Sequence, residues 1–247
     1  MQTPKSEETS KFYDGLMDGS EVRGVFGRDR RFNPQRILSR HSTKKYFLEA
    51  LRPYFSGQEV VLDLGCGPGA FLAALAPLCK EIIGADISSN FVATCQELIG
   101  QIGLSNARAI HVASHRLPFP EDQFDALLLV DVIHHLGDVD GTLREAFRVT
   151  KPGGRIFIFE PNKFNPLLSL MCIFDRNEWG FLKMGTPAFY RKLLSSRMEM
   201  ERIEFNGLLI GPESALFDRM TDLMNRHLLK TLIGWLNPKI FITGRKL

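Results

Sequence analysis

Two carboxylates and three glycines are the residues of this 247-residue chain whose types and spacing best suit the binding of a ligand. Gly65, Gly67 and Gly69 follow Asp63 in the sequence DLGCGPG, and Asp86 lies 17 residues beyond Gly69. Glycines allow a sharp turn where a strand passes into a helix, and they let a ligand approach the backbone closely. A pyrophosphate at this turn would lie beside the like charge of Asp63. We therefore expect a ligand that carries no phosphate there.

A ligand with an ammonium group and a ribose would satisfy both acids. Asp63 would lie near the ammonium, and Asp86 would accept hydrogen bonds from the ribose hydroxyls. S-adenosylmethionine has this distribution of groups. Two alternatives remain for the same glycines, namely a tight strand-to-helix connection without a ligand and a site for a nicotinamide or flavin dinucleotide.

A pair of histidines follows the apolar run 124–130, in the sequence VDVIHHL. Either His134 or His135 could remove a proton from a hydroxyl or a phenol. The alternative is that His135 packs beneath a loop and that His134 caps or lines a pocket. Asp131 precedes them and could help to hold a cofactor or lie near a metal. Because a lone acid does not make an oxygen-rich metal site, we expect no metal.

The elements that must position these groups alternate along the chain, as short apolar runs rich in β-branched residues separated by helical patterns. The pattern predicts strands over 59–64, 81–86, 107–113, 124–130, 155–160, 200–209 and 239–244. It predicts helices over 70–78, 140–149 and 187–197, and another that Ser88 and Ser89 would cap. Near-continuous apolar strands indicate a sheet that is covered on both faces.

Four motifs in order, DLGCGPG, GADIS, LPFPEDQFDALLLVDVIHHL and KPGGRIFIFEPN, resemble those of the class I S-adenosylmethionine-dependent methyltransferases. Within that family the chain is similar to the type 11-like branch that acts on small molecules, quinones and lipids. The resemblance covers roughly residues 59–162. It implies an α/β, Rossmann-like fold, with a seven-stranded, mostly parallel sheet, helices on both faces and an antiparallel last strand. It also implies S-adenosyl-L-methionine as the cofactor and S-adenosyl-L-homocysteine as the product.

The same resemblance assigns candidate cofactor contacts. The glycine turn would line the methionine and ribose, and Asp86 with Ile87 would hold the ribose and adenine. Many relatives have an aspartate at the position of Ala113, so here only Ser114 or the backbone could meet the adenine amino group. An early aromatic residue, Phe12 or Tyr13, would fold over the cofactor as a lid, and a plain packing role is the alternative. The expected cofactor-binding residues are Asp63, Gly65, Cys66, Gly67, Gly69, Asp86, Ile87, Ser114, Val130, Asp131 and Tyr13.

We expect three parts in the chain. Residues 1–56 would form an N-terminal helical lid, 57–163 the cofactor-binding core, and 164–247 a half that completes the sheet and adds substrate-cap insertions. Residues 21–45 carry eight basic and two acidic side chains. Such a run is either a solvated helical face or a surface that recognises an anionic substrate or membrane.

Two apolar stretches bear on the acceptor. Residues 164–174 are rich in large apolar side chains, and 213–236 predicts a helix with one apolar face between the last two strands. Ordinary core and cap packing is the alternative for both. With the basic run they favour a lipidic or aromatic acceptor over a sugar. Glu160 and Asn162, at the end of the fifth strand, could contact that acceptor or serve the fold.

Composition limits the remaining choices. The chain has 44% hydrophobic residues, 31 basic and 28 acidic residues, and a net charge of +3, which excludes a disordered or collagen-like protein. Its four cysteines show no metal-binding spacing, which favours a reducing compartment. Residues 1–10 lack the apolar region of a signal peptide, and no run is long enough to span a bilayer. We expect a cytoplasmic protein, with peripheral membrane contact left open.

These observations predict an enzyme that transfers a methyl group from S-adenosylmethionine to O, N or C of a small acceptor. A protein that binds the cofactor without turnover is one alternative. A nucleic-acid methyltransferase is another, but the chain has VDVIHH where an NPPY-type motif would stand. We therefore expect no nucleic-acid partner, and the sequence does not indicate the oligomeric state.

Overall fold

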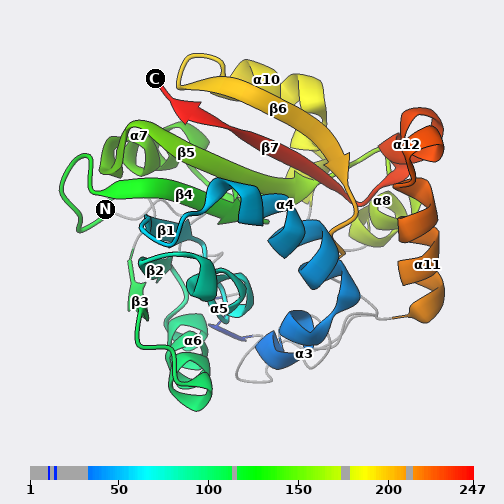
Figure 1. Cartoon of the computed structure of the whole chain (residues 1–247). Helices are drawn as coiled ribbons and strands as arrows, with labels where there is room; N and C mark the ends of the chain where they lie inside the picture. Colours follow the sequence, from blue (N-terminus) through cyan, green and yellow to red (C-terminus); the bar gives the residue numbers. More distant parts are fainter. Residues whose placement is uncertain (1–10, 12–13, 16–32, 113–115, 174–178, 210–213) are drawn as a thin grey trace.

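A computed structural model describes residue 11 and residues 14–15, 33–112, 116–173, 179–209 and 214–247 (Figure 1). Seven strands form one sheet in the order β3-β2-β1-β4-β5-β7-β6. Strand β7 is antiparallel to both of its neighbours, and β1 to β5 are parallel to one another. The expected sheet, with its antiparallel last strand, is confirmed. The strands are β1 (Val60–Leu64), β2 (Glu81–Asp86), β3 (Ala107–His111), β4 (Phe124–Val130), β5 (Thr150–Pro161), β6 (Met198–Asn206) and β7 (Lys239–Lys246).

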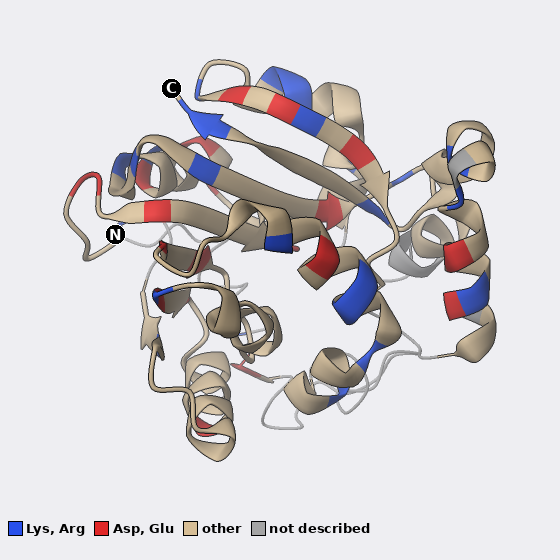
Figure 2. Ribbon diagram, in the orientation of Figure 1, with Lys and Arg blue, Asp and Glu red and all other residues tan. Residues whose placement is uncertain are grey.

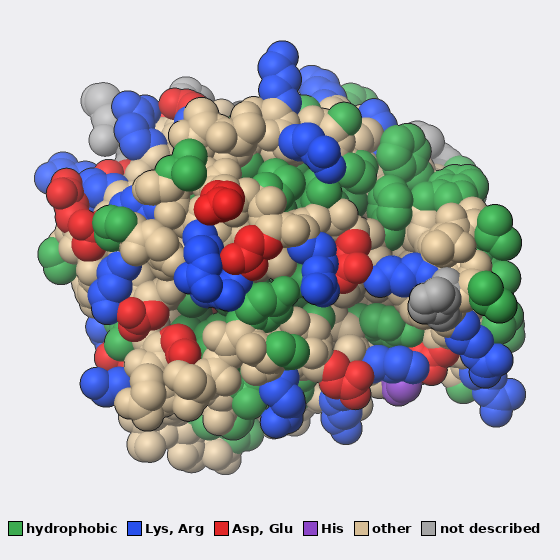
Figure 3. Space-filling view, turned by 45° about the horizontal axis from the view of Figure 1, so that its top comes forward, with side chains coloured by type: hydrophobic (Ala, Val, Ile, Leu, Met, Phe, Trp, Pro, Cys, Tyr) green, Lys and Arg blue, Asp and Glu red, His purple; other side chains and the backbone are tan. Residues whose placement is uncertain are grey.

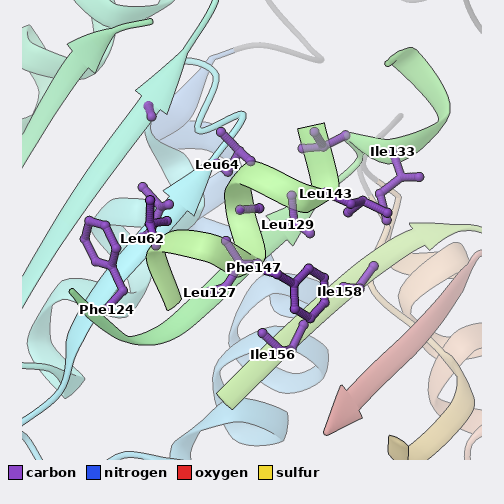
Figure 4. Close-up of a cluster of buried hydrophobic side chains, with 14 of the residues drawn as sticks. Leu62, Leu64, Phe124, Leu127, Leu129, Ile133, Leu143, Phe147, Ile156 and Ile158 are labelled. Atoms are coloured by element: carbon purple, nitrogen blue, oxygen red, sulfur yellow. The ribbon is translucent and has the colours of Figure 1, made fainter. Parts of the chain in front are cut away.

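The central strands are apolar throughout because both faces of the sheet are covered. Successive side chains point to opposite faces, so each strand feeds two cores. On β5, Ile156 and Ile158 enter one core, whereas Phe157 and Phe159 enter the other. Figure 4 shows the first core, in which side chains of β1, β4 and β5 meet Leu143 and nearby residues.

Different helices close the two cores. Helices α7 (Val139–Val149) and α10 (Pro187–Leu194) contribute to the first, and η1 (Thr43–Leu48), α4 (Glu49–Leu51), α5 (Ala70–Leu75) and α6 (Ser89–Ile102) contribute to the second. Ser88 caps α6, since its hydroxyl accepts the Phe91 N–H at 3.2 Å. The expected cap is confirmed. The remaining elements are α3 (Pro34–Ser39), η2 (Arg52–Tyr54), η3 (Ala76–Leu78), η4 (Ile133–His135), α8 (Pro166–Ile173), α9 (Trp179–Met184), α11 (Ala215–Met224), α12 (His227–Ile233) and η6 (Gly234–Leu236).

The single helix expected over 213–236 is wrong, because the described residues 214–236 form two α-helices, α11 and α12, followed by the short 3-10 helix η6. Asn225 donates from Nδ2 to the Thr221 carbonyl at 2.8 Å and to Asn237 Oδ1 at 2.8 Å. Arg226 then adopts an extended conformation, with φ −67° and ψ 143°. The side-chain amide of Asn225 thus ties this break to the segment before β7, and the two apolar faces have separate axes.

The groups that could do chemistry gather at one edge of the sheet, beyond the carboxyl ends of the parallel strands. The glycine turn follows β1, Asp86 ends β2, and η4 follows β4. Pro161 at the end of β5 pairs with Lys239 at the start of β7, so the insertion that carries α11 and α12 reaches the same edge. In open α/β sheets this edge is where ligands bind.

Candidate cofactor and acceptor site

The glycine turn uses its three glycines in two ways. Gly65, Gly67 and Gly69 all have positive φ angles, of +77°, +52° and +90°. A Cβ atom on Gly65 would lie 2.5 Å from Val132, and one on Gly69 would lie 2.4 Å from Cys95 Sγ, so packing requires these two glycines. A Cβ atom on Gly67 would meet no atom of the described residues within 4 Å. Gly67 therefore faces open space, as a backbone that cradles a ligand should.

Asp86 holds this turn in place. Its Oδ2 accepts the Gly67 N–H at 2.8 Å, and its Oδ1 accepts the Ser88 N–H at 2.9 Å. The side chain is buried, and burial raises the pKa of Asp86. The two hydrogen bonds act in the other direction, but the net effect is a raised pKa. Each carboxylate oxygen can accept a second hydrogen bond. Asp86 can thus support the turn and still accept from a ribose hydroxyl.

Asp63 is a buried acid whose partner is not supplied by the described part of the chain. It is 1% exposed, and its Oδ2 has no hydrogen-bond partner among the described residues. Burial, together with the negative charge of Asp86, raises the pKa of Asp63 to about 8. A buried polar group without a partner costs free energy unless a ligand satisfies it. A cationic group of a ligand would do so here.

The N-terminal segment reaches this site through a residue that sequence analysis missed. Asp14 Oδ1 accepts the Ser88 hydroxyl at 2.6 Å and the Asn90 N–H at 3.3 Å, while its carbonyl accepts Asn90 Nδ2 at 3.1 Å. Asp14 therefore lies at the start of α6, beside the backbone that Asp86 holds. Nothing in the local sequence pattern marked it. Phe12 and Tyr13, the expected lid, lie outside the described residues, as do Ser114 and the arginines before residue 33.

Cys66 and Ile87 flank the turn. Cys66 is buried, and a hydrogen bond with Cys95, with burial, raises the pKa of its thiol well above the usual value. The raised pKa keeps the Cys66 thiol neutral, and its contact with the cofactor stays a prediction. The Ile87 carbonyl accepts His111 Nε2 at 2.8 Å, which fixes the backbone beyond Asp86.

Asp131 follows β4 in a left-handed conformation, with φ +57°. Its N–H donates to the Phe159 carbonyl at 2.9 Å, and its carboxylate forms an ion pair with the buried Lys239. Val130 before it is buried. The carboxylate of Asp131 would therefore share any cofactor contact with Lys239, a residue that the sequence analysis did not single out.

The buried His134 is the centre of a polar network at the same edge. Its Nδ1 lies 2.7 Å from Glu160 Oε2, and the Tyr190 hydroxyl donates to that same oxygen at 3.1 Å. Glu160 Oε1 accepts the N–H groups of Val132 and Ile133, at 2.9 and 2.8 Å. One buried carboxylate thus fixes both the backbone of η4 and the orientation of the His134 ring.

The charges in this network are set by the same contacts. Against the effect of burial, the charge and hydrogen bond of His134 hold the pKa of Glu160 below its usual value. Burial and the charge of Glu160 raise the pKa of Tyr190 well above its usual value. Glu160 is therefore the anion, and Tyr190 is a neutral donor to it. Tyr190 was missed because it comes from α10, whose pattern predicts only packing.

The two histidines differ in their surroundings. His134 is 1% exposed, whereas His135 is half-buried, and the two ring centroids lie 3.8 Å apart. Asn162 has a structural contact, since its Nδ2 donates to the carbonyls of Trp235 and Asn237 at 2.7 and 2.8 Å. Among the described residues, no three His, Cys, Asp or Glu side chains are grouped so that they could hold a metal ion. No described helix is long and apolar enough to cross a membrane.

Comparison with known proteins decides the family. Residues 62–158 match the model of a methyltransferase domain. The chain is 30% identical over 211 residues to the ubiquinone/menaquinone biosynthesis C-methyltransferase UbiE of Pasteurella multocida, which covers 78% of each protein. The chain belongs to the class I S-adenosylmethionine-dependent methyltransferases.

Two further likenesses extend over different lengths. The chain is 34% identical over 100 residues to the uncharacterized methyltransferase YcgJ of Bacillus subtilis, and this match spans 40% of each protein. A solved structure of geranyl diphosphate C-methyltransferase from Streptomyces coelicolor A3(2) is 14% identical and covers 99% of each chain, with a TM-score of 0.61. The fold of this methyltransferase is therefore shared over its whole length, whereas the sequence likeness to YcgJ covers less than half of either protein.

The residues at the edge of the sheet fit the cofactor of this family. S-adenosylmethionine carries an ammonium group, and the buried Oδ2 of Asp63 lacks a partner among the described residues. It also needs a close approach to the backbone, and Gly67 faces open space. These two features belong to the chain itself and do not depend on the family assignment.

Proposed function

We propose that this chain transfers a methyl group from S-adenosylmethionine to O, N or C of a small acceptor that is apolar, aromatic or lipidic. The observation that carries the proposal is the buried Asp63, whose Oδ2 finds no partner in the described chain, beside the open turn at Gly67. A carboxylate kept in this state suits a cationic ligand. A strand-to-helix turn that serves only the fold would not require it.

The cofactor would be held by groups from three strand ends. Asp63 would meet the ammonium, the turn at Gly67 would lie against the methionine portion, and Asp86 would accept from the ribose. Ile87, Ser114 and Tyr13 remain candidates for the adenine and the lid, and Val130 with Asp131 for the wall after β4. When bound, the cofactor supplies a methyl group on a positively charged sulfur, so that the chain mainly has to align and desolvate the acceptor.

His134 is the candidate base. In the transfer, the acceptor atom forms a bond to the methyl carbon, the bond between that carbon and sulfur breaks, and a proton leaves the acceptor. In the neutral form of His134, which is the form that can act as a base, Nδ1 donates its hydrogen bond to Glu160 and Nε2 carries the lone pair. That nitrogen would take the proton. His135, half-buried beside it, is the second candidate.

The acceptor class is supported from two sides. The relatives with longer matches include a ubiquinone/menaquinone C-methyltransferase, and a protein of the same fold acts on geranyl diphosphate according to its description. This chain itself carries large apolar side chains on α8 and α11, at the edge where the site lies. We therefore propose an apolar acceptor, such as a phenol or a polyprenyl-like compound, for a protein that works in the cytoplasm or peripherally at a membrane.

A screen of acceptors with a radiolabelled methyl donor tests the proposal. Quinones, prenyl compounds, phenols and lipid extracts would be incubated with the full chain, and transfer of label to the organic phase would be measured. Calorimetry with S-adenosylhomocysteine would be run in parallel. Binding with no transfer to any acceptor would favour a protein that binds the cofactor without turnover. The absence of binding would contradict the proposal altogether.

Replacing His134 by Gln tests the proposed base once an acceptor is known. General-base catalysis contributes about 10²- to 10⁴-fold to a rate, so we expect kcat to fall by about that factor. Affinity for S-adenosylhomocysteine should stay close to that of the parent protein, whereas the melting temperature should fall, because the buried Glu160 loses its contact with His134 Nδ1. His135→Gln is the matched control, and its effect should be smaller. If the two variants lose equal activity, or if only His135→Gln loses it, the assignment to His134 is wrong.

A further inference from the structure

Large exposed apolar side chains are concentrated in one part of the molecule. Within the described part of the chain, all of them except Ile102 and Leu247 lie between residues 164 and 235. Among those between residues 164 and 235, the most exposed are on α12 and α11, where Leu228 is 79%, Leu232 69% and Leu216 64% exposed. We call this the helix-end surface, defined by Leu167, Leu170, Leu216, Leu223, Leu228 and Leu232. Soluble proteins rarely leave so many large apolar groups together without a use for them.

The spacing on α11 shows that this is an outward face. Leu216, Met220 and Leu223 recur at helical intervals of four and three residues, and all three are exposed. The opposite side of the helix carries Asp222, which accepts the Tyr46 hydroxyl at 2.7 Å. The helix is therefore already docked through its polar side, and its apolar side is presented outward.

The helices that form the surface are tied to one another. Asn165, just before α8, donates from Nδ2 to the Leu236 carbonyl at 2.5 Å, and Asn162 donates to the Trp235 carbonyl at 2.7 Å. Helix α12 leads directly into η6, which holds both of those carbonyls. In Figure 3, hydrophobic side chains gather at the right-hand end of the molecule, where Figure 1 places α8, α11 and α12.

The most exposed charged residues of the insertion are basic. Every exposed charged residue in the described part of 214–236 is basic, namely Arg219, Arg226 and Lys230. Lys230 is paired with Glu204 at 2.8 Å. Arg219 and Arg226 have no side-chain ion pair or hydrogen bond within the described part of the chain. Helix α11 also carries acidic residues, which are coloured red in Figure 2. These acidic residues are half-buried, and one of them, Asp222, is paired with Lys45 at 3.0 Å.

We propose that the helix-end surface docks this protein on the surface of an anionic lipid bilayer. Leucine side chains would enter the boundary between headgroups and acyl chains, while Arg219 and Arg226 would meet anionic headgroups. No described helix is long and apolar enough to cross a bilayer, so the contact would be interfacial. A second copy of the chain fits less well, because a two-fold interface would bring the same unpaired arginines of both copies together.

Docking would bring the candidate site close to the lipid. The insertion with α11 and α12 starts and ends at the carboxyl edge of the sheet, where β7 pairs with the end of β5. An apolar acceptor could then pass from the bilayer to the site without crossing water. This delivery rests on the proposed function, whereas the docking itself does not, and the two are tested separately.

Vesicle sedimentation with the full chain tests the docking. The probes are vesicles of phosphatidylcholine alone and vesicles of phosphatidylcholine with phosphatidylglycerol, each at low and high salt. We expect binding to the anionic vesicles, weakened by salt, and at least tenfold weaker binding for Leu228→Asp/Leu232→Asp. Arg219→Gln/Arg226→Gln should lose about fivefold for each charge removed, on anionic vesicles only.

Two control variants change residues at the other edge of the sheet, away from the carboxyl ends of the parallel strands. Leu247→Asp replaces an apolar side chain that is 65% exposed at the end of β7, and Lys80→Gln removes an exposed charge at the start of β2. Both should bind vesicles like the parent chain. Failure of the parent chain to bind anionic vesicles, or equal losses in the control variants, would overturn the proposal. So would a stable dimer in analytical ultracentrifugation that Leu228→Asp/Leu232→Asp dissociates, since the surface would then join two copies. Calorimetry with S-adenosylhomocysteine on the same variants tests cofactor binding by itself, so that a failure of vesicle docking can be told apart from a failure of the proposed function.

Discussion

Asp63 shows how a proposed binding site can keep a buried acid neutral until a cationic ligand arrives. With the pKa of its carboxyl raised from 3.8 to about 8, the folded protein without ligand holds this group mainly protonated at neutral pH. A group with a raised folded pKa stabilises the fold below the unfolded pKa, and this contribution is lost as the pH rises to the folded value. The ligand-free protein should therefore lose stability between about pH 4 and pH 8 through this group.

Replacing Asp63 by Asn should separate stability from binding. The variant keeps the shape but cannot ionise, so at pH 8 the ligand-free variant should unfold at a higher temperature than the parent chain. Its affinity for S-adenosylhomocysteine should fall, because the ammonium loses its charged partner. Thermal denaturation at pH 5 and pH 8 measures the first effect, and calorimetry the second. A lower melting temperature for the variant at pH 8 would contradict the assignment of a raised pKa to Asp63.

Binding itself should be linked to proton release. At pH 7 an ammonium group beside Asp63 favours the ionised carboxylate, so close to one proton should leave the protein on binding. The binding enthalpy should then differ between phosphate and Tris buffers, which have different ionisation enthalpies. For Asp63→Asn the two enthalpies should be equal. Equal enthalpies for the parent chain would place the ammonium elsewhere.

Two glycines with similar backbones allow the cradle to be tested by itself. Gly67 and Gly153 both have positive φ angles, +52° and +71°, and a Cβ atom on either would meet no described residue within 4 Å. An alanine at either position should cost about 1–2 kcal/mol of stability through backbone strain. Only Gly67→Ala should also weaken the binding of S-adenosylhomocysteine in calorimetry, because its methyl group would enter the space of the ligand. Equal affinities for the two variants would remove Gly67 from the site.

At the scale of elements, one carboxylate ties α11 to the N-terminal helices. Asp222 accepts the Tyr46 hydroxyl at 2.7 Å and pairs with Lys45 and His41, each at 3.0 Å. Against the effect of burial, the hydrogen bonds from Tyr46, His41 and Lys45 lower the pKa of Asp222 to about 2. Because the folded pKa is lowered, this contact stabilises the fold above about pH 4 and is lost as the pH falls toward 2.

Asp222→Asn should therefore loosen α11 without unfolding the sheet. Hydrogen exchange at pH 7 should become several-fold faster for the amides of 215–224 and stay unchanged for β4 and β5. Asp140→Asn is the matched control, since Asp140 also forms ion pairs, with Arg144 and Arg197, but on α7. It should leave the exchange of α11 as it was. Unchanged exchange of 215–224 in Asp222→Asn would mean that apolar packing alone holds this helix.

Some features of these elements can be predicted from local sequence, and others depend on residues that are distant in the chain. The strands and the cap at Ser88 follow from local patterns, because apolar runs and capping residues act over a few positions. The break at Asn225 does not, since it depends on Asn237, twelve residues away and outside the helical pattern. The same holds for the site. The glycine turn is local, whereas Tyr190, Lys239 and Asp14 reach it only through the tertiary fold.

At the scale of the whole molecule, the sheet makes the proposed core and the C-terminal half one structure. Strand β7 pairs with β5 from Arg155↔Arg245 to Pro161↔Lys239, and β6 pairs with β7 along its length. Phe159 and Phe241 stack across this junction, with ring centroids 4.5 Å apart. The division at residue 163 stays a proposed division of roles, and we expect both parts to unfold together.

Saturation with S-adenosylhomocysteine should therefore stabilise residues that lie far from the ligand. At 100 times its dissociation constant a ligand adds about 2.7 kcal/mol to the unfolding free energy. For a chain of this size that raises the melting temperature by about 5 to 10 °C. Both tryptophans, Trp179 and Trp235, belong to the C-terminal half, so their fluorescence reports on it, whereas circular dichroism reports on the whole chain. Because the sheet is continuous, the two melting curves should coincide and shift together, and at the same ligand concentration both shifts should be smaller in Asp63→Asn. A fluorescence transition that stays in place while the dichroism shifts would mean that the C-terminal half unfolds independently of the cofactor-binding core.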